Sequence, residues 1–192
     1  GLGGRLDATN VVDAPRLCAE LLMCHVLGKQ RIELYTEFDQ VVPPAQLADL
    51  RALVKRAGDQ EPVAYLVGKT EFYSLELNVR QGCLIPRPET EMLVQYAIEF
   101  LRTRDGQQTV LDLCTGSGCI AAAIAHNFKE AHITATDLSQ DALTIATENI
   151  TKHQLTERVT LCQGDLLTPV TCGPFDLIVS NPPYVSDAEM DA

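Results

Sequence analysis

Apolar positions in the first third of the chain recur at the three- and four-residue spacing of amphipathic helices. One run follows Pro15 as far as Gly28, a second follows Pro44 as far as Gly58, and a short third extends from Pro62 to Gly68. Proline suits the first turn of a helix and glycine the position just past its end, so each run has a start and a stop signal. We expect a small helical bundle over residues 1–68.

The spacing of apolar residues changes to two between Phe72 and Ile85. In this stretch they alternate with polar residues, at Leu75, Leu77 and Val79. The alternation is typical of a half-buried strand, and the pair Gln81-Gly82 that follows is a turn signal. We therefore expect a β-hairpin connector over residues 69–86, with its turn at Gln81-Gly82.

From Arg87 onward, helical and strand patterns alternate along the chain. The expected strands are 109–113, 132–136, 159–162 and 175–179, and the expected helices are 92–101, 120–128 and 141–153. Such alternation predicts a parallel, doubly wound sheet whose binding crevice lies at the carboxyl ends of the strands. The predicted fold class is α/β and Rossmann-like over residues 87–192, preceded by the helical bundle and the connector.

Composition narrows the range of partners and compartments. The 192 residues are 46% hydrophobic, enough for one large or two smaller cores, and their formal net charge of -11 disfavours phosphate backbones. The 7 cysteines show no CxxC spacing, as expected of reduced thiols. No leader-like segment or bilayer-length apolar run stands out. We expect a soluble, cytoplasmic protein with no nucleic-acid or membrane partner and no metal site.

Residues suited to chemistry come directly after the predicted strands. The loop Thr115-Gly116-Ser117-Gly118 follows the first strand, Asp137 the second, Asp165 the third and Asn181 the fourth. The carboxyl ends of parallel strands meet at one edge of a sheet, so we expect these residues to share that edge.

The glycine loop and the first two acids favour a nucleotide-like ligand without identifying it. Gly116 and Gly118 let the backbone approach a ligand closely, ahead of a helix N-terminus. The loop also fits G-x-G-x-x-A, with Asp137 placed to bind the ribose of a nicotinamide cofactor. The alternatives are a ligand-free turn and, for Asp137, a helix N-cap that Ser139 could equally provide. Asp165 could contact an adenine amine or simply form a turn.

The segment Asn181-Pro182-Pro183-Tyr184 separates methyl transfer from hydride transfer. The Asn181 amide oxygen and the Pro182 carbonyl can accept both N–H bonds of a planar NH2 group, Pro183 offers no competing N–H, and Tyr184 can pack on that group. Hydride transfer has no use for such a clamp. Methyl transfer to a delocalised nitrogen does, because the acceptors stabilise the charge that develops. The alternative is a strand terminator with Tyr184 covering the core.

Taken together, NPPY at 181–184, DLCTGSG at 112–118 and Asp137 resemble class I S-adenosylmethionine-dependent methyltransferases. EPVAYLVGKTEFYSLELNV at 61–79 and LIPRPETE at 84–91 resemble the HemK/PrmC family of protein-glutamine methyltransferases. The resemblance implies methyl transfer from S-adenosylmethionine to the glutamine side-chain nitrogen of the Gly-Gly-Gln motif in peptide-chain release factors. It also implies that residues 1–68 recognise the substrate and that residues 87–192 form the methyltransferase domain.

The same resemblance implies roles for individual residues. The implied cofactor contacts are Asp112, Cys114, Thr115, Gly116, Ser117, Gly118, Asp137, Asp165, Leu166 and Asn181. The implied catalytic group is Asn181, Pro182, Pro183 and Tyr184, which would hold the glutamine amide. Cys114 departs from the pattern, because it stands where the fuller loop has its first glycine. Arg87 and Glu89 of PRPETE either fix a segment over the cofactor or simply begin a helix.

Two other functions remain open at this stage. NPPY also occurs in methyltransferases that act on the amino groups of DNA or RNA bases, although the acidic composition weighs against them. The third possibility is an inactive cofactor-binding module. The resemblance implies strands in the order 3-2-1-4-5-7-6, and only strands 1 to 4 are found before Ala192. We therefore expect an incomplete sheet in a C-terminally incomplete chain.

Overall fold

A computed structural model describes residues 15–183 of the chain. These residues divide into two compact units, and the boundary lies between Gly68 and Lys69. Each unit has its own hydrophobic core. In the described residues, no helix combines the length and the apolar character needed to cross a membrane.

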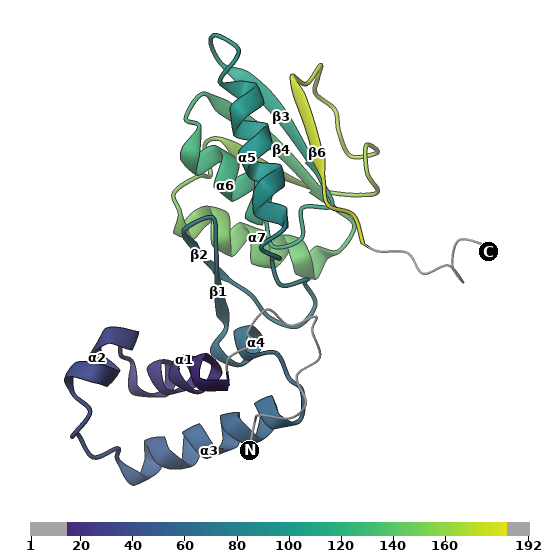
Figure 1. The fold of residues 1–192 in the computed structure, drawn as a ribbon. Helices are drawn as coiled ribbons and strands as arrows, with labels where there is room; N and C mark the ends of the chain where they lie inside the picture. Colours follow the sequence, from purple (N-terminus) through teal and green to yellow (C-terminus); the bar gives the residue numbers. More distant parts are fainter. Residues whose placement is uncertain (1–14, 184–192) are drawn as a thin grey trace. The chain divides into compact units, whose positions relative to one another are not determined.

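The first unit is helical (Figure 1). Its helices are α1 (Pro15–Leu27), α2 (Arg31–Thr36), α3 (Pro44–Gly58) and α4 (Val63–Val67). α1 packs against α3 and α4, and the core between them is formed by Leu22, Ala57 and Leu66. The three helices expected from the sequence are confirmed. The sequence did not predict α2, because its 6 residues are too few to show a helical period.

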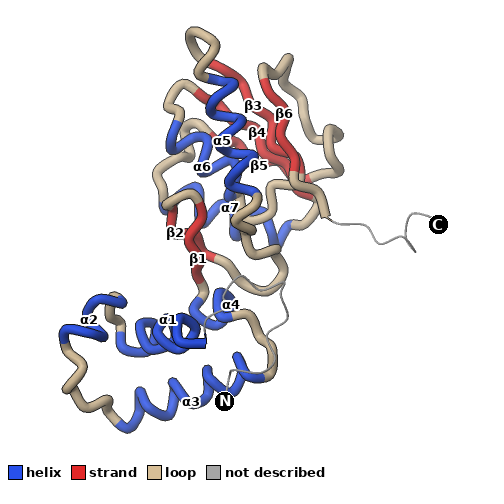
Figure 2. The backbone as a smooth tube through the Cα atoms, viewed as in Figure 1, coloured by secondary structure: helices blue, strands red, loops and turns tan. Residues whose placement is uncertain are grey.

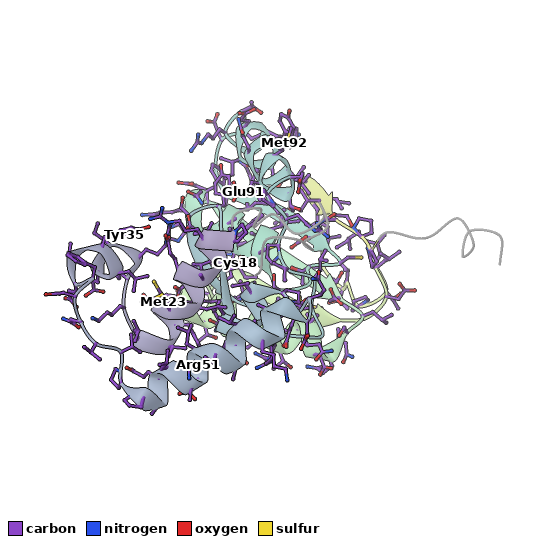
Figure 3. All side chains as sticks on the ribbon, turned by 60° about the horizontal axis from the view of Figure 1, so that its bottom comes forward. Cys18, Met23, Tyr35, Arg51, Glu91 and Met92 are labelled. Atoms are coloured by element: carbon purple, nitrogen blue, oxygen red, sulfur yellow. The ribbon has the colours of Figure 1, made fainter. Side chains whose placement is uncertain are left out.

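A buried carboxylate joins α1 to α2. Glu20 accepts hydrogen bonds from Tyr35, from Arg31 at 2.7 Å and from Arg16 at 2.9 Å. These bonds, that of Tyr35 first, lower the pKa of Glu20 to about 2. Tyr35, labelled in Figure 3, comes from the helix that the sequence did not predict. The cluster therefore gives a short helix with no buried residues of its own a fixed place on α1.

The second unit begins with an antiparallel hairpin of β1 (Lys69–Phe72) and β2 (Leu75–Asn78). Phe72 pairs with Leu75, so the turn that joins the two strands lies at Tyr73-Ser74. Gln81-Gly82 do form a turn, closed by a hydrogen bond from the Cys83 N–H to the Arg80 carbonyl, but this turn follows β2 and does not join the strands of the hairpin. A two-residue hairpin loop of this kind requires positive φ at both positions. Tyr73 and Ser74 adopt φ of 49° and 63° although neither is a glycine or asparagine. The usual sequence signal for this turn is therefore missing.

The rest of the second unit is an α/β layer structure, as predicted. Its elements are α5 (Thr90–Leu101), β3 (Gln108–Leu113), α6 (Cys119–Asn127), β4 (Ala131–Asp137), α7 (Gln140–Lys152), β5 (Val159–Gln163) and β6 (Leu177–Ser180). The strands are all parallel and lie in the order β5-β4-β3-β6 (Figure 2). This order equals the 3-2-1-4 expected for the first four strands of a class I methyltransferase sheet.

The two faces of this sheet differ. α5, α6 and α7 pack side by side against one face, where the buried strand residues include Val110, Ile133 and Val179. Over the other face runs the segment between β5 and β6, held by hydrogen bonds from Thr136 to the Leu166 carbonyl and from Thr109 to the Pro174 carbonyl. The core of this unit lies between the sheet and the three helices, and the candidate residues follow the carboxyl ends of the strands.

Candidate functional site at the carboxyl edge of the sheet

The strand register brings the candidate residues to one edge. Leu113, the last residue of β3, pairs with Thr136 on one side and with Ser180 on the other. Asp137, the last residue of β4, pairs with Gln163 of β5. The residues that follow these strands therefore lie along the same edge, as the sequence predicted.

The loop after β3 is bound to β4 through its backbone. The Thr115 N–H donates to the Thr136 carbonyl at 2.9 Å, and the Gly116 N–H donates to the Asp137 carboxylate at 2.8 Å. Gly116 and Cys114 both have φ of 58°. Cys114 thus adopts the left-handed backbone that a glycine would adopt more easily, at the position where the fuller motif has one.

Gly118 is required where the loop becomes α6. Its φ is 75°, and a Cβ atom built there would lie 3.1 Å from the Cβ of Ala146 on α7. A side chain at this position would press on α7, so the absence of a side chain favours this close approach. The first turn of α6 therefore lies against a neighbouring helix. The N–H groups of this turn, which have no partner within the helix, are held in position.

The sequence left open whether Asp137 or Ser139 caps the helix that follows β4. Ser139 is the N-cap of α7, because its hydroxyl accepts the Ala142 N–H at 3.2 Å. The Asp137 carboxylate accepts the Gly116 N–H with one oxygen and the Ser139 N–H, at 2.9 Å, with the other. Each carboxylate oxygen has a second lone pair, so Asp137 can still accept hydroxyl groups of a ligand.

Asp112 supports the loop from below. Its side chain is fully buried, and one of its oxygens accepts the Thr115 hydroxyl at 2.6 Å. Within residues 15–183 the other oxygen has no hydrogen-bond partner. Burial is the main reason that the pKa of Asp112 rises to about 7. The geometry gives this acid a place beneath the loop, where it can shape a binding site through Thr115.

Asn149 of α7 is a site residue that the sequence analysis missed. Its fully buried amide donates to the Ser117 carbonyl at 2.9 Å and to the Asn78 carbonyl at 3.1 Å, and it accepts the Asn78 N–H at 2.7 Å. One side chain thus joins the loop, α7 and the hairpin. In the sequence it is one polar residue among others in a helix, and the residues it contacts are far away along the chain.

Asp165 and Leu166 lie in a turn after β5. The Asp165 carbonyl accepts the Thr168 N–H at 2.8 Å, and the Leu166 carbonyl accepts the Thr136 hydroxyl at 3.1 Å. The backbone of Asp165 thus forms the turn, while its side chain is exposed. Leu166 is 51% exposed, so an apolar side chain is available beside the ends of β4 and β5.

Asn181 follows β6 at the same edge. Its side-chain NH2 donates to the hydroxyl of Thr90, the first residue of α5, at 3.2 Å. Pro182 and Pro183 are exposed, whereas Tyr184 lies outside the described residues. Thr90 was not predicted as a site residue, because the candidates in the PRPETE segment were Arg87 and Glu89. Glu89 is the N-cap of α5, and its side chain makes no capping hydrogen bond.

A pocket of about 260 Å³ opens elsewhere on this unit. Its lining includes Thr109 and His132, near the amino-terminal ends of β3 and β4, together with the segment Cys172-Gly173-Pro174-Phe175. It is therefore at the opposite edge of the sheet from the loop, Asp137 and Asn181. Among residues 15–183, no group of His, Cys, Asp and Glu side chains is arranged to hold a metal ion.

Comparison with known proteins gives a consistent set of relatives. Residues 90–192 match the family model described as methyltransferase small domain, and residues 4–68 match the PrmC N-terminal domain. A protein of Rhodopirellula baltica named release factor glutamine methyltransferase is 48% identical over 183 residues, which are 93% of this chain and 62% of that protein. A protein of the same name from Chlorobaculum tepidum is 40% identical over 190 residues, or 95% of this chain and 65% of that protein.

Solved structures agree on the fold. The human methyltransferase 10 domain containing protein matches with a TM-score of 0.50 and 17% identity, covering 62% of this chain and 59% of that one. The methyltransferase domain of METTL16 matches with a TM-score of 0.50 and 19% identity over 58% of this chain and 53% of that one. The chain spans 62% and 65% of the length of the two relatives above.

Proposed function

This chain belongs to the methyltransferase small-domain family and carries a PrmC N-terminal domain in front of that domain, and from this premise we propose a specific reaction. The protein transfers a methyl group from S-adenosylmethionine to the side-chain amide nitrogen of the glutamine in the Gly-Gly-Gln motif of peptide-chain release factors. The observation that carries the proposal is the position of Asn181 at the same sheet edge as the glycine loop and Asp137.

The residues at this edge fit S-adenosylmethionine. Asp137 would accept the ribose hydroxyls with the lone pairs that the Gly116 and Ser139 N–H groups leave free, and the exposed side chain of Leu166 with Asp165 would border the adenine. The loop from Cys114 to Gly118 would line the methionine end. When bound, the cofactor supplies an electrophilic methyl group, and the loop and Asp137 fix its position relative to Asn181.

The clamp provides what a weakly nucleophilic amide needs. The Asn181 side-chain oxygen and the Pro182 carbonyl accept the two N–H bonds of the glutamine amide, and Pro183 adds no competing donor. As the nitrogen is alkylated it becomes positively charged, so these acceptors bind the transition state more tightly than the ground state. No residue has to act as a strong base, because the proton can leave to water afterwards. Packing of Tyr184 on the amide stays a prediction.

The substrate assignment is supported by the relatives, whose names specify release factor glutamine methylation. The net charge of -11 opposes binding to a nucleic-acid backbone and so favours a protein substrate over DNA or RNA bases. We assign substrate recognition to the helical residues up to Gly68 and place the reaction in the cytoplasm, where release factors act.

The test is methyl transfer by the full-length protein from radiolabelled S-adenosylmethionine. The substrates are a release factor, the same factor with its Gly-Gly-Gln glutamine changed to alanine, and duplex DNA. We expect label on the unchanged release factor alone. Label on DNA would support the base-methylating alternative, and cofactor binding without transfer to any substrate would support an inactive binding module.

A further inference from the structure

We propose that Thr90 is a positioning residue for the reaction, because its hydroxyl holds the nitrogen of the Asn181 amide and leaves the amide oxygen available to the substrate. The inference rests on the proposed function and extends it to a residue of the PRPETE segment. The Nδ2 atom of Asn181 lies 3.2 Å from the Oγ1 atom of Thr90, across 91 positions of sequence. One N–H of the amide is thereby engaged, and the amide oxygen is left available as an acceptor.

The orientation of this amide matters because its two ends are almost identical in shape and opposite in hydrogen bonding. The terminal torsion of asparagine is broad, so rotation by a half turn exchanges the oxygen and the nitrogen. A substrate NH2 group needs the oxygen. If the nitrogen of Asn181 faced it instead, two donors would meet and the clamp would oppose binding. In the structure the Thr90 hydroxyl accepts from the nitrogen, and this contact holds the amide with its oxygen available to a substrate.

Thr90 is well placed to hold it. The side chain is only 8% exposed, and its β-branched shape restricts the torsion that aims the hydroxyl. The Thr90 N–H donates to the Arg87 carbonyl at 3.0 Å, which fixes the backbone at the start of α5. Further along the same helix, Val94 and Ala97 are buried in the core, so the helix that carries Thr90 is anchored to the sheet.

The next residue joins the same turn of α5 to the hairpin. Glu91, labelled in Figure 3, accepts the Tyr73 N–H at 2.8 Å, at the hairpin turn. The far end of the hairpin is held by Asn149 through Asn78, and Asn149 also holds the Ser117 carbonyl of the loop. The first turn of α5 therefore connects Asn181 with the hairpin, and through it with the glycine loop. This gives two adjacent residues of PRPETE a physical role that the sequence did not reveal.

The experiment compares Thr90→Val with Thr90→Ser in the full-length protein. Valine keeps nearly the same shape and removes the hydroxyl, whereas serine keeps the hydroxyl. We expect Thr90→Val to lower kcat about three- to tenfold, the worth of one hydrogen bond, with unchanged affinity for S-adenosylmethionine. Thr90→Ser should restore most of the rate. In an Asn181→Ala background, Thr90→Val should have no further effect on the rate.

Thr103→Val is the matched control, because it makes the same change just past the other end of α5, where the hydroxyl bonds to the nearby Phe100 carbonyl. It should leave kcat unchanged. An equal loss of kcat in Thr90→Ser and Thr90→Val, or a loss in Thr90→Val that persists without Asn181, would overturn the positioning role.

A second readout does not depend on the substrate. The side-chain amide signals of Asn181 in a ¹⁵N-¹H spectrum should shift in Thr90→Val and stay close to wild type in Thr90→Ser. Unchanged signals in Thr90→Val would overturn the contact itself. If wild-type protein methylated no release factor, the proposed function would fall, while these signals would still decide whether Thr90 holds the amide.

Discussion

In the proposed reaction Asn181 uses both ends of its side-chain amide. Its nitrogen donates to Thr90, so the remaining oxygen is a fixed acceptor at the edge where the loop and Asp137 also lie. An acceptor held in place before the reaction costs no reorganisation when charge develops on the substrate nitrogen. Loss of this one atom should therefore affect the chemical step more than binding.

We predict that Asn181→Ala abolishes most methyl transfer and leaves S-adenosylmethionine binding nearly intact. Removal of an acceptor of this kind costs about two to three decades in rate. The measurements are the rate of methyl transfer to a release factor and the affinity for S-adenosylmethionine by calorimetry. Asn127→Ala, at the far end of α6, is the control, since its amide bonds only within its own helix. Near-normal turnover by Asn181→Ala would remove this residue from the mechanism.

Asp112 allows a prediction about pH. Burial raises its pKa from the ordinary 3.8 to about 7. Between these values the unfolded chain releases the proton and the folded chain retains it, so this residue lowers stability as the pH rises from about 4 to 7. The carboxylate form is the less stable one in the folded protein, because one of its oxygens has no partner among residues 15–183.

We therefore expect Asp112→Asn to remove this dependence. Compared with wild type, the variant should become progressively more stable as the pH is raised through this window, by up to about 1.4 kcal/mol per pH unit. Denaturant unfolding of both proteins at a series of pH values measures the difference. Parallel stability curves would mean that Asp112 titrates at its ordinary pKa in the folded protein.

At the scale of elements, the site depends on how closely α6 and α7 approach. Gly118 begins α6 against Ala146, and Asn149 of α7 binds the Ser117 carbonyl one residue before Gly118. The loop is therefore held from α7 on both sides of the helix start. Its shape follows from helix packing as much as from its own sequence.

Gly118→Ala should destabilise the protein more than Gly106→Ala. Both glycines have similar positive φ, 75° and 81°, so both variants bear the cost of an alanine in left-handed backbone. At Gly118 the new methyl group would also press on Ala146, whereas at Gly106 nothing lies within 4 Å. We expect an additional loss of about 1–3 kcal/mol at Gly118, with weaker cofactor binding. Equal losses in the two variants would mean that α7 moves away at little cost.

At the scale of the whole molecule, the resemblance to the HemK/PrmC family is confirmed. The two family models match residues 4–68 and 90–192, in the order expected for that family. The hairpin that follows Gly68 belongs to the second unit, where it bonds to α7 and α5. The hairpin, which the sequence predicts as a connector, is thus bonded to helices of the second unit.

β6 has one feature that bears on association. In the described part of the chain it pairs only with β3, and its sequence Leu177-Ile178-Val179-Ser180 carries no charge. Ile178 is 55% exposed. Uncharged edge strands offer unpaired backbone groups to other chains. A polypeptide of these 192 residues is therefore expected to associate.

Ile178→Lys should reduce that association, because a charge on an edge strand opposes pairing with a second copy. Light scattering with size-exclusion chromatography, over a range of protein concentrations, measures it. Val41→Lys makes the same kind of change at an apolar residue that is 91% exposed in the helical unit, and should have no effect. A monodisperse wild-type monomer at all concentrations would show that the edge of β6 is not adhesive.

The sequence by itself determined the three longer helical runs of the first unit and the alternating helices and strands after Arg87, because hydrophobic periodicity is a local property of the chain. It also determined which residues follow the strands, and parallel pairing then brings those residues to one edge. The loop from Thr115 to Gly118, Asp137 and Asn181 were found in this way.

Only the tertiary structure decided how these residues are held. The contacts of Asn181 with Thr90 and of Asn149 with Asn78 join residues 91 and 71 positions apart, and no local pattern encodes such a pair. The hairpin turn at Tyr73-Ser74 was missed for a related reason. Its backbone is imposed by strand pairing and by Glu91, whereas the residues themselves carry no turn signal. Periodicity fixes what each segment becomes, and packing between distant segments fixes which polar groups meet.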